Sequence, residues 1–288
     1  RFQFNRTSPR TFVLDRVKEL FLTVLLMAPL LLLVLWVFET WGGYAWLISW
    51  GFFVAFTLLV TYVAPLWILP LFYRFQPLPD GDLKSAIQRM AEQCRFPLRE
   101  VYQIDGSTRS TKTNAFFTGL GKNKRIALFD TLIHKHTVPE LVCVLAHEIG
   151  HYRRKHILKL MVIGFAESGL LFFLAGLFLK HRELSNAFGV RDVSVYTSLV
   201  FFSILFTPLS RVLGIATLGL QRRHEFEADA FAAEVTGDPG SLVAGLKKLA
   251  QDNLTNLTPH PLYVFLNYSH PPIPERLAAL ASSTRTKG

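Results

Sequence analysis

Four long apolar stretches dominate the pattern of hydrophobic and polar positions along the chain. They cover residues 21–38, 40–73, 160–179 and 194–220. Each is long enough to cross a bilayer core as a helix, which takes about 20 residues. Glu167 interrupts the third stretch and Arg211 the fourth, whereas Pro65 and Pro70 favour a bend or an end within the second. We therefore predict four membrane-spanning helices.

The polar segment between the second and third stretches has a different periodicity. From Asp82 to Cys94 the apolar residues recur with the period of a helix, and the pattern from Val101 to Ile104 predicts a short strand. Residues 114–118 and 125–129 predict two more strands, joined through residues 121–124. This small sheet either holds a substrate as an added strand along its edge or only supports the helix that follows it.

Composition and charge support a membrane protein. Half of the 288 residues are hydrophobic, mean hydropathy is +0.30, and the net charge is +10. The basic residues cluster beside the apolar stretches, which fits the positive-inside rule and argues against a nucleic-acid partner. Cys94 and Cys143 have no metal-type spacing and imply no disulfide framework.

The loop charges also predict an organisation along the chain. It comprises a cytoplasmic juxtamembrane segment (1–20), two transmembrane helices (21–73), a cytoplasmic catalytic segment with the sheet (74–159), two transmembrane helices with a short loop (160–220), and a cytoplasmic C-terminal segment (221–288). The compact polar segments slightly favour a prokaryotic inner membrane over an endoplasmic reticulum.

The candidate chemistry begins at His147-Glu148-Ile149-Gly150-His151. Residues four apart lie on one face of a helix, so the two imidazoles can bind one metal ion while Glu148 reaches the water that the metal activates. Thr137 and Glu140 form a capping-box pattern, so the motif falls on a helix that begins there and has an apolar face. We interpret the motif as part of a zinc-peptidase active site, the alternative being a helix with two surface histidines.

A catalytic zinc takes a third protein ligand, and the common pattern with a later histidine is missing after His151. The best candidate segment is 224–229, because Glu225 and Asp229 share a helical face there. One of them can bind zinc while the other orients a ligand histidine. His224 remains a rival ligand, and Glu227 is expected on a solvated face.

Three motifs in order resemble the type-1 CAAX prenyl protease family, with the bacterial HtpX-type membrane proteases as more distant relatives. They are residues 147–151, residues 222–229, and Asn267-Tyr-Ser-His-Pro-Pro272 followed by Glu275-Arg276-Leu277. The resemblance extends to residues 114–119 and 124–131. It implies a mainly α, multi-span membrane protein with a zincin-like catalytic region that carries a small β-sheet. The family fold has seven spans around a water-filled chamber, so the resemblance implies that the first spans are absent from this chain.

The resemblance also implies roles for single residues. His147, His151 and Glu225 match the zinc ligands and Glu148 the catalytic base, with one Zn²⁺ per chain. Asp229 matches a supporting acid near the metal, and Arg276 matches an arginine near the site. His270 matches a histidine that binds the substrate carbonyl or its oxyanion, and Asn114 matches a residue that contacts the substrate backbone. We expect the remaining histidines, His156 among them, to be surface or structural residues.

The predicted function is that of a membrane-embedded zinc endopeptidase. The expected substrate is a peptide or prenylated protein cleaved near its CAAX C-terminus at the cytoplasmic face of a lipid bilayer. One alternative is a broad quality-control protease of the HtpX type, which has the same chemistry. A second is an inactive membrane scaffold that binds zinc for structure, against which the presence of Glu148 argues.

Overall fold

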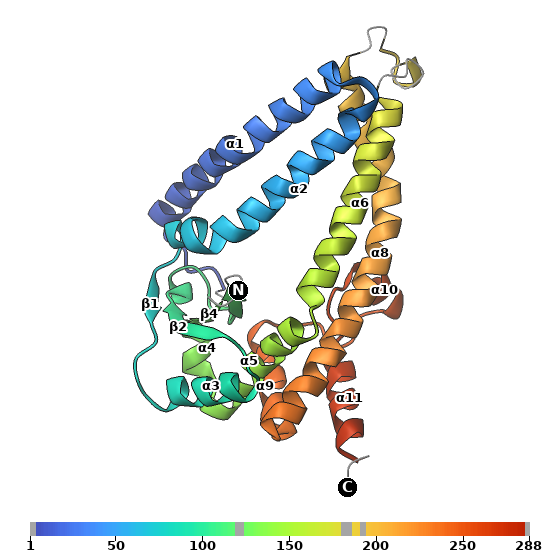
Figure 1. Cartoon of the computed structure of the whole chain (residues 1–288). Coiled ribbons are helices and arrows are strands. Elements are labelled where there is room, and N and C mark those ends of the chain that lie inside the picture. The colour runs from blue at the N-terminus through green and yellow to red at the C-terminus, as the bar shows by residue number, and fades with distance from the viewer. Residues whose placement is uncertain (1–3, 119–123, 180–185, 191–193, 286–288) are drawn as a thin grey trace. The chain divides into compact units, whose positions relative to one another are not determined.

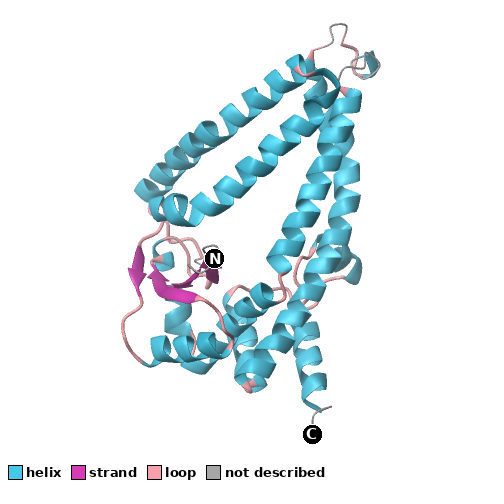
Figure 2. Ribbon diagram, in the orientation of Figure 1, coloured by secondary structure: helices cyan, strands magenta, loops and turns pink. Residues whose placement is uncertain are grey.

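The structure is a computed structural model that describes residues 4–118, 124–179, 186–190 and 194–285 (Figure 1). Helices make up most of these residues, and the strands form one small sheet (Figure 2). The chain divides into two compact units. Unit 1 comprises Arg1–Phe12, Tyr62–Ile157 and Leu218–Gly288, and unit 2 comprises Val13–Thr61 and Leu158–Thr217.

Unit 2 consists of parts of four long helices. These helices are α1 (Pro9–Thr40), α2 (Ala45–Val63), α6 (His156–Phe178) and α8 (Val195–Thr236). Within the described residues, four helical segments are long and apolar enough to cross a membrane, α2 being counted together with the turns on either side of it. The four predicted stretches thus lie on four membrane-length helices, although α1 and α8 both extend well beyond the apolar stretches that predicted them.

The ends of the second span follow from its glycines and prolines. A 3₁₀ turn, Gly42–Tyr44, separates α1 from α2, and Gly42 has a φ of +58°, a conformation that glycine adopts without strain. At the other end α2 gives way to a π turn at Ala64–Ile68 and a 3₁₀ turn at Leu69–Leu71. Each proline lacks a backbone N–H, so the regular α-helix cannot continue through this segment.

The interior of unit 2 is a cluster of aliphatic and aromatic residues. Its buried members are Leu30, Val34, Val37, Phe38, Ala45, Ala175, Leu179 and Phe202. Trp46 packs against Gly176, where an added Cβ would lie 2.9 Å from the tryptophan side chain. Trp50 donates a hydrogen bond to the carbonyl oxygen of Phe165 at 3.0 Å. Glu167, inside the third span, accepts a hydrogen bond from the Thr217 hydroxyl at 2.9 Å, so this intramembrane carboxyl has a polar partner.

Unit 1 contains a four-stranded mixed sheet in the order β1-β2-β4-β3. Its strands are β1 (Phe75–Pro77), β2 (Leu98–Ile104), β3 (Ala115–Thr118) and β4 (Lys124–Phe129). β2 and β4 are parallel, and the other pairs are antiparallel. The three predicted strands are confirmed, but β1 was not predicted, because three residues that end in a proline give no alternating pattern. Most of the predicted 121–124 connection lies outside the described residues.

The helices of unit 1 carry the site. They are α3 (Asp82–Gln93), α4 (Asp130–Lys135), α5 (Val138–Arg153), α9 (Pro239–Asp252), α10 (Pro261–Asn267), α11 (Ile273–Arg285) and the last part of α8. α5 is central, since Leu141, Leu145 and Ile149 are each only 1% exposed and lie in the main hydrophobic core. A helix buried on this face holds the polar residues of its other face in fixed positions.

Candidate metal centre

The helix that carries the HExxH motif begins as its sequence predicts. Thr137 and Glu140 form a capping box, in which the Thr137 N–H donates to the Glu140 carboxylate at 2.9 Å, and Pro139 lies in the first turn. Lys248 of α9 donates to the same carboxylate at 2.7 Å. Burial raises the pKa of Glu140, but these two hydrogen bonds lower it more, and the net shift is downward. The start of α5 is therefore tied to α9 through a charged group.

Gly150 lets α5 approach α8 closely. A Cβ at this position would lie 3.1 Å from the Cα of Ala228 and 3.2 Å from its carbonyl oxygen. Both are backbone atoms, so they cannot move without shifting α8. The glycine between the two histidines therefore sets the distance between the helix that carries them and the helix that carries Glu225.

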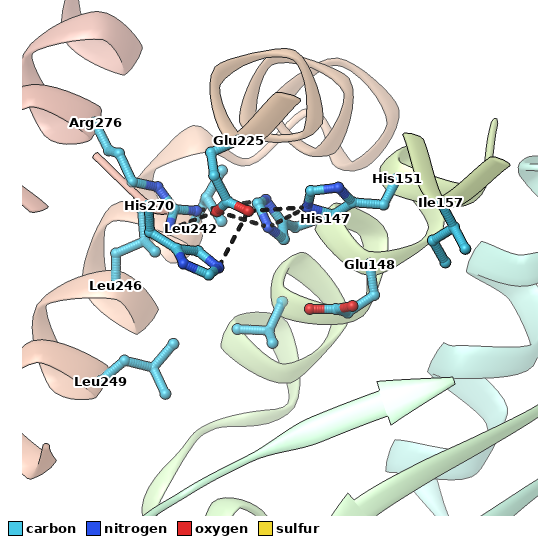
Figure 3. Close-up of a pocket in the computed structure, with 11 residues that line it drawn as sticks. His147, Glu148, His151, Ile157, Glu225, Leu242, Leu246, Leu249, His270 and Arg276 are labelled. Carbon is cyan, nitrogen blue, oxygen red and sulfur yellow. Dashed lines mark hydrogen bonds and ion pairs between the residues drawn. The ribbon is translucent and has the colours of Figure 1, made fainter. Parts of the chain in front are cut away.

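His147, His151 and Glu225 form the one group of three candidate metal ligands found among the described residues. Their ligand atoms all lie within 4.8 Å of one another. The two Nε2 atoms are 3.1 Å apart, and the Glu225 carboxylate lies 3.5 Å from His147 Nε2 and 3.3 Å from His151 Nε2. Figure 3 shows the three side chains converging from α5 and α8.

The chemistry of this group fits zinc. Two imidazoles and a carboxylate are a donor set of catalytic zinc sites, which leave the fourth position open. Glu225 is 5% exposed, and although Arg276 lies 3.2 Å from its Oε2 atom, that atom accepts no hydrogen bond from any residue that the structure describes, which leaves it available to a cation. His224, the rival ligand, lies outside this group, so the structure favours the carboxylate.

A buried ion-pair network supports the first ligand. His147 Nδ1 lies 2.9 Å from Asp229, and Arg276 of α11 donates two hydrogen bonds to the same carboxylate, at 2.6 and 2.7 Å. Arg276 also lies 3.2 Å from Glu225. Burial lowers the pKa of His147, but its contacts with the Asp229 and Glu225 carboxylates raise it more, to about 9. The carboxylate of Asp229 thus holds the His147 ring with Nε2 facing the centre of the cluster.

Glu148 lies beside the cluster and faces an open cavity. The cavity has a volume of about 360 Å³, and Glu148, Glu225 and His270 line its polar side (Figure 3). Its apolar side includes Leu246 and Leu249 of α9. Burial is the largest influence on Glu148 and raises its pKa above the ordinary value of a glutamate. A carboxyl with a raised pKa, open to a cavity and next to a metal site, is suited to proton transfer.

His270 lies at the mouth of this cavity, in the loop before α11. Its side chain is 66% exposed, and its Nε2 is 3.3 Å from Glu225. The Ser269 hydroxyl contacts its Nδ1 at 2.8 Å. Arg222 of α8 holds the loop, because it donates to the carbonyl oxygens of Tyr268 at 2.6 Å and Val264 at 3.2 Å. Neither Ser269 nor Arg222 was identified from the sequence as a contributor.

Asn114 lies apart from these residues. It is exposed and immediately precedes the edge strand β3, and its side chain accepts a hydrogen bond from the Ala115 N–H at 2.9 Å. It does not line the cavity beside the metal ligands. Its contact with a substrate backbone therefore stays a prediction.

One expectation about a neighbouring residue is corrected, whereas His156 is buried and is thus one of the expected structural histidines. His156 is 1% exposed, and its two ring nitrogens contact His151 and Glu227, each at 3.1 Å. Glu227 was expected on a solvated face, yet its side chain is only 32% exposed and also pairs with Arg223. The helical spacing places Glu227 on a different face of α8 from Glu225. It does not reveal that His156, just after α5, contacts Glu227.

Two family models match the chain. Residues 77–284 match peptidase family M48, and residues 1–74 match the CAAX prenyl protease N-terminal family, which is described as five membrane helices. The boundary between the two matches falls at the end of the second span. The chain therefore combines a peptidase region with part of a membrane region.

Similar proteins agree in sequence and in fold. The probable CAAX prenyl protease 1 of Schizosaccharomyces pombe is 38% identical over 288 residues, which cover 100% of this chain and 60% of that protein. The Homo sapiens CAAX prenyl protease 1 homolog is 34% identical, over 96% of this chain and 66% of its own length. The crystal structure of S. mikatae Ste24p superposes with a TM-score of 0.91 at 33% identity, over 97% of this chain and 68% of that one. This chain spans about two thirds of their length.

Proposed function

The chain belongs to the type-1 CAAX prenyl protease family within peptidase family M48, and we propose that it is a zinc endopeptidase that cleaves prenylated CAAX proteins at a membrane. One observation carries the proposal: His147, His151 and Glu225 meet at hydrogen-bonding distances beside a cavity into which Glu148 opens. A metal that only stabilised the fold would have four protein ligands and no access to a cavity.

The proposed mechanism assigns the proton transfers to Glu148. When bound, Zn²⁺ supplies a Lewis acid that activates water and polarises the scissile carbonyl. Glu148 takes the proton of the attacking water and delivers it to the leaving amine. Its raised pKa suits both steps, since a carboxyl that holds a proton more readily than usual is the better base and can still release it.

His270 is proposed as the group that stabilises the oxyanion. Because most of its side chain is exposed at the cavity mouth, it can turn toward a substrate carbonyl. A donor aimed at charge that develops only in the transition state typically contributes a factor of 10²–10³ to the rate. Asp229 and Arg276 take no part in the proton transfers; they hold His147 and Glu225 in place.

The cavity lining supports a substrate with aliphatic residues near the scissile bond. Leu242, Leu246 and Leu249 follow one another at spacings of four and three along α9, so they form one apolar ridge that lines the cavity. An extended peptide would meet the ligands on one side and this ridge on the other. We propose that it continues along the edge strand β3, where Asn114 contacts its backbone.

The test compares a farnesylated CAAX peptide with its unlipidated twin. We expect the chain to cleave the farnesylated peptide preferentially in detergent with one Zn²⁺ bound, and Glu148→Gln to retain the metal but lose cleavage. Equal cleavage of both peptides would favour a broad quality-control protease. Retention of cleavage by Glu148→Gln would refute the assigned mechanism, and zinc binding without any cleavage would leave only a scaffold.

The chain is an integral, multi-pass membrane protein, and we further propose that its catalytic segments face the cytoplasm. The loop charges support segments 1–20, 74–159 and 221–288 on that side. Single cysteines introduced at exposed Arg10 and Ser282 should react with an impermeant reagent from the cytoplasmic side only. The relatives named above come from eukaryotes, so the preference for a prokaryotic membrane has no support.

A further inference from the structure

The second zinc ligand, His151, contacts His156, and His156 in turn contacts Glu227. Both residues lie outside the ligand set. Its Nδ1 atom lies 3.1 Å from Nδ1 of His156, and Nε2 of His156 lies 3.1 Å from a carboxylate oxygen of Glu227. His156 is 1% exposed, and its ring stacks on His224 with centroids 3.9 Å apart and planes 7° apart. The ring is therefore held in one orientation.

The hydrogen-bonding chemistry of these three groups allows one consistent arrangement when His156 is neutral. A carboxylate only accepts hydrogen bonds, so the Nε2 atom of His156 must carry the proton that faces Glu227. A neutral imidazole has one N–H, so Nδ1 of His156 is then an acceptor. It can accept only from an N–H on Nδ1 of His151, and this leaves the lone pair of His151 on Nε2, the atom that faces His147 and Glu225.

We propose that His156 and Glu227 are positioning residues that fix the tautomer and the ring orientation of the metal ligand His151. The proposal rests on the zinc site proposed above and extends it by two residues. His147 receives the same support directly, because its Nδ1 faces the Asp229 carboxylate. Orienting partners of ligand histidines typically raise metal affinity 10–100-fold.

The local fold explains how His156 reaches its place. α5 ends at Arg153, and Lys155 has a φ of +57°, a left-handed conformation that separates α5 from α6, which begins at His156. Glu227 lies on α8, two residues from the ligand Glu225. The turn after α5 supplies His156 and α8 supplies Glu227, and the two side chains meet beside His151.

The test measures zinc affinity of the full chain in detergent by competition with a chelator. His156→Leu removes the acceptor, whereas His156→Asn has a similar shape and places an amide oxygen near the position of Nδ1. We expect His156→Leu to bind Zn²⁺ 10–100-fold more weakly than wild type and His156→Asn to recover part of that loss. Glu227→Gln should weaken binding about tenfold, while Glu234→Gln, the same change at an exposed residue of α8, should not.

Further readouts separate positioning from a general structural role. The visible spectrum of the Co²⁺-loaded chain should change in His156→Leu, and the rise in melting temperature caused by Zn²⁺ should shrink. Wild-type zinc affinity and an unchanged Co²⁺ spectrum in His156→Leu would overturn the proposal, as would equal affinities of Glu227→Gln and Glu234→Gln. If either of these results is found while Glu225→Ala loses zinc, the positioning role of His156 and Glu227 is overturned but the zinc site stands. Wild-type zinc binding in Glu225→Ala would refute the zinc site itself.

Discussion

Replacement of Arg276 by methionine should destabilise the protein more than the same replacement at an exposed arginine. Arg276 is 6% exposed and contacts two buried carboxylates, with 2.6 and 2.7 Å bonds to Asp229 and a 3.2 Å contact to Glu225. Methionine fills similar space but removes the guanidinium that both carboxylates contact, which leaves them with the neighbouring imidazoles. Removal of one partner of a buried pair typically costs about 3–5 kcal/mol, and we expect a loss of unfolding free energy in this range for the zinc-free protein.

The assay is denaturant unfolding in detergent, with and without saturating Zn²⁺. The loss of unfolding free energy in Arg276→Met should be smaller with zinc, because the ion offsets part of the charge of Glu225. Arg223→Met is the matched control: that side chain is 78% exposed and pairs with Glu227, so we expect a change within about 0.5 kcal/mol.

A double-mutant cycle isolates the Arg276–Asp229 contact. Asp229→Asn removes the charge that Arg276 neutralises, so Arg276→Met should cost less in that background, and we expect a coupling of about 2–3 kcal/mol. If the two changes are additive, the short buried hydrogen bonds contribute nothing to stability. The reasoning that assigns Arg276 the role of holding Asp229 would then be refuted.

Three further predictions concern α5. Glu148→Gln should keep zinc binding and lower the cleavage rate 10²–10⁴-fold, as measured with the farnesylated peptide. Gly150→Ala should cost about 1–3 kcal/mol and weaken zinc binding, because the new Cβ meets the Ala228 backbone at 3.1 Å; wild-type unfolding and zinc binding would contradict this close contact. Glu140→Gln should cost about 1–2 kcal/mol at pH 7. Because the pKa of Glu140 is lowered in the folded state, the greater unfolding free energy of wild type should persist above pH 5. It should vanish as pH falls below the ordinary glutamate pKa of about 4.3 and through the lowered folded pKa. A difference in unfolding free energy that stays constant between pH 7 and pH 3 would contradict this.

The parts of the site that the sequence predicted are those that depend on local spacing. The capping box at Thr137 and Glu140, the two histidines four apart, and the shared face of Glu225 and Asp229 are all set by the period of one helix. The spacing left open which carboxylate binds the metal. The structure indicates Glu225, because its carboxylate lies beside Nε2 of both histidines, whereas Asp229 contacts Nδ1 of His147 and accepts hydrogen bonds from Arg276.

The parts that the sequence missed depend on where the chain turns. A lysine rarely has a positive φ, so nothing in Arg153-Arg154-Lys155 indicates a helix end there that brings His156 into contact with His151. The parallel pairing of β2 with β4 was missed for a related reason. It joins strands that are separated by β3 in the chain, and no single turn specifies the register.

The helix α8 shows how a small stretch of sequence serves both ligand histidines. Glu225, Glu227 and Asp229 lie within five residues, and on a helix Glu227 is rotated by about 200° from Glu225. Glu225 and Asp229 therefore contact the two ligand histidines directly, whereas Glu227 reaches His151 only through His156. Asp229 depends in turn on Arg276 of α11, while Glu227 depends on the turn after α5. Because the two histidines are oriented through different elements, disturbance of α11 should weaken the hold on His147, and disturbance of the turn at Lys155 should weaken the hold on His151.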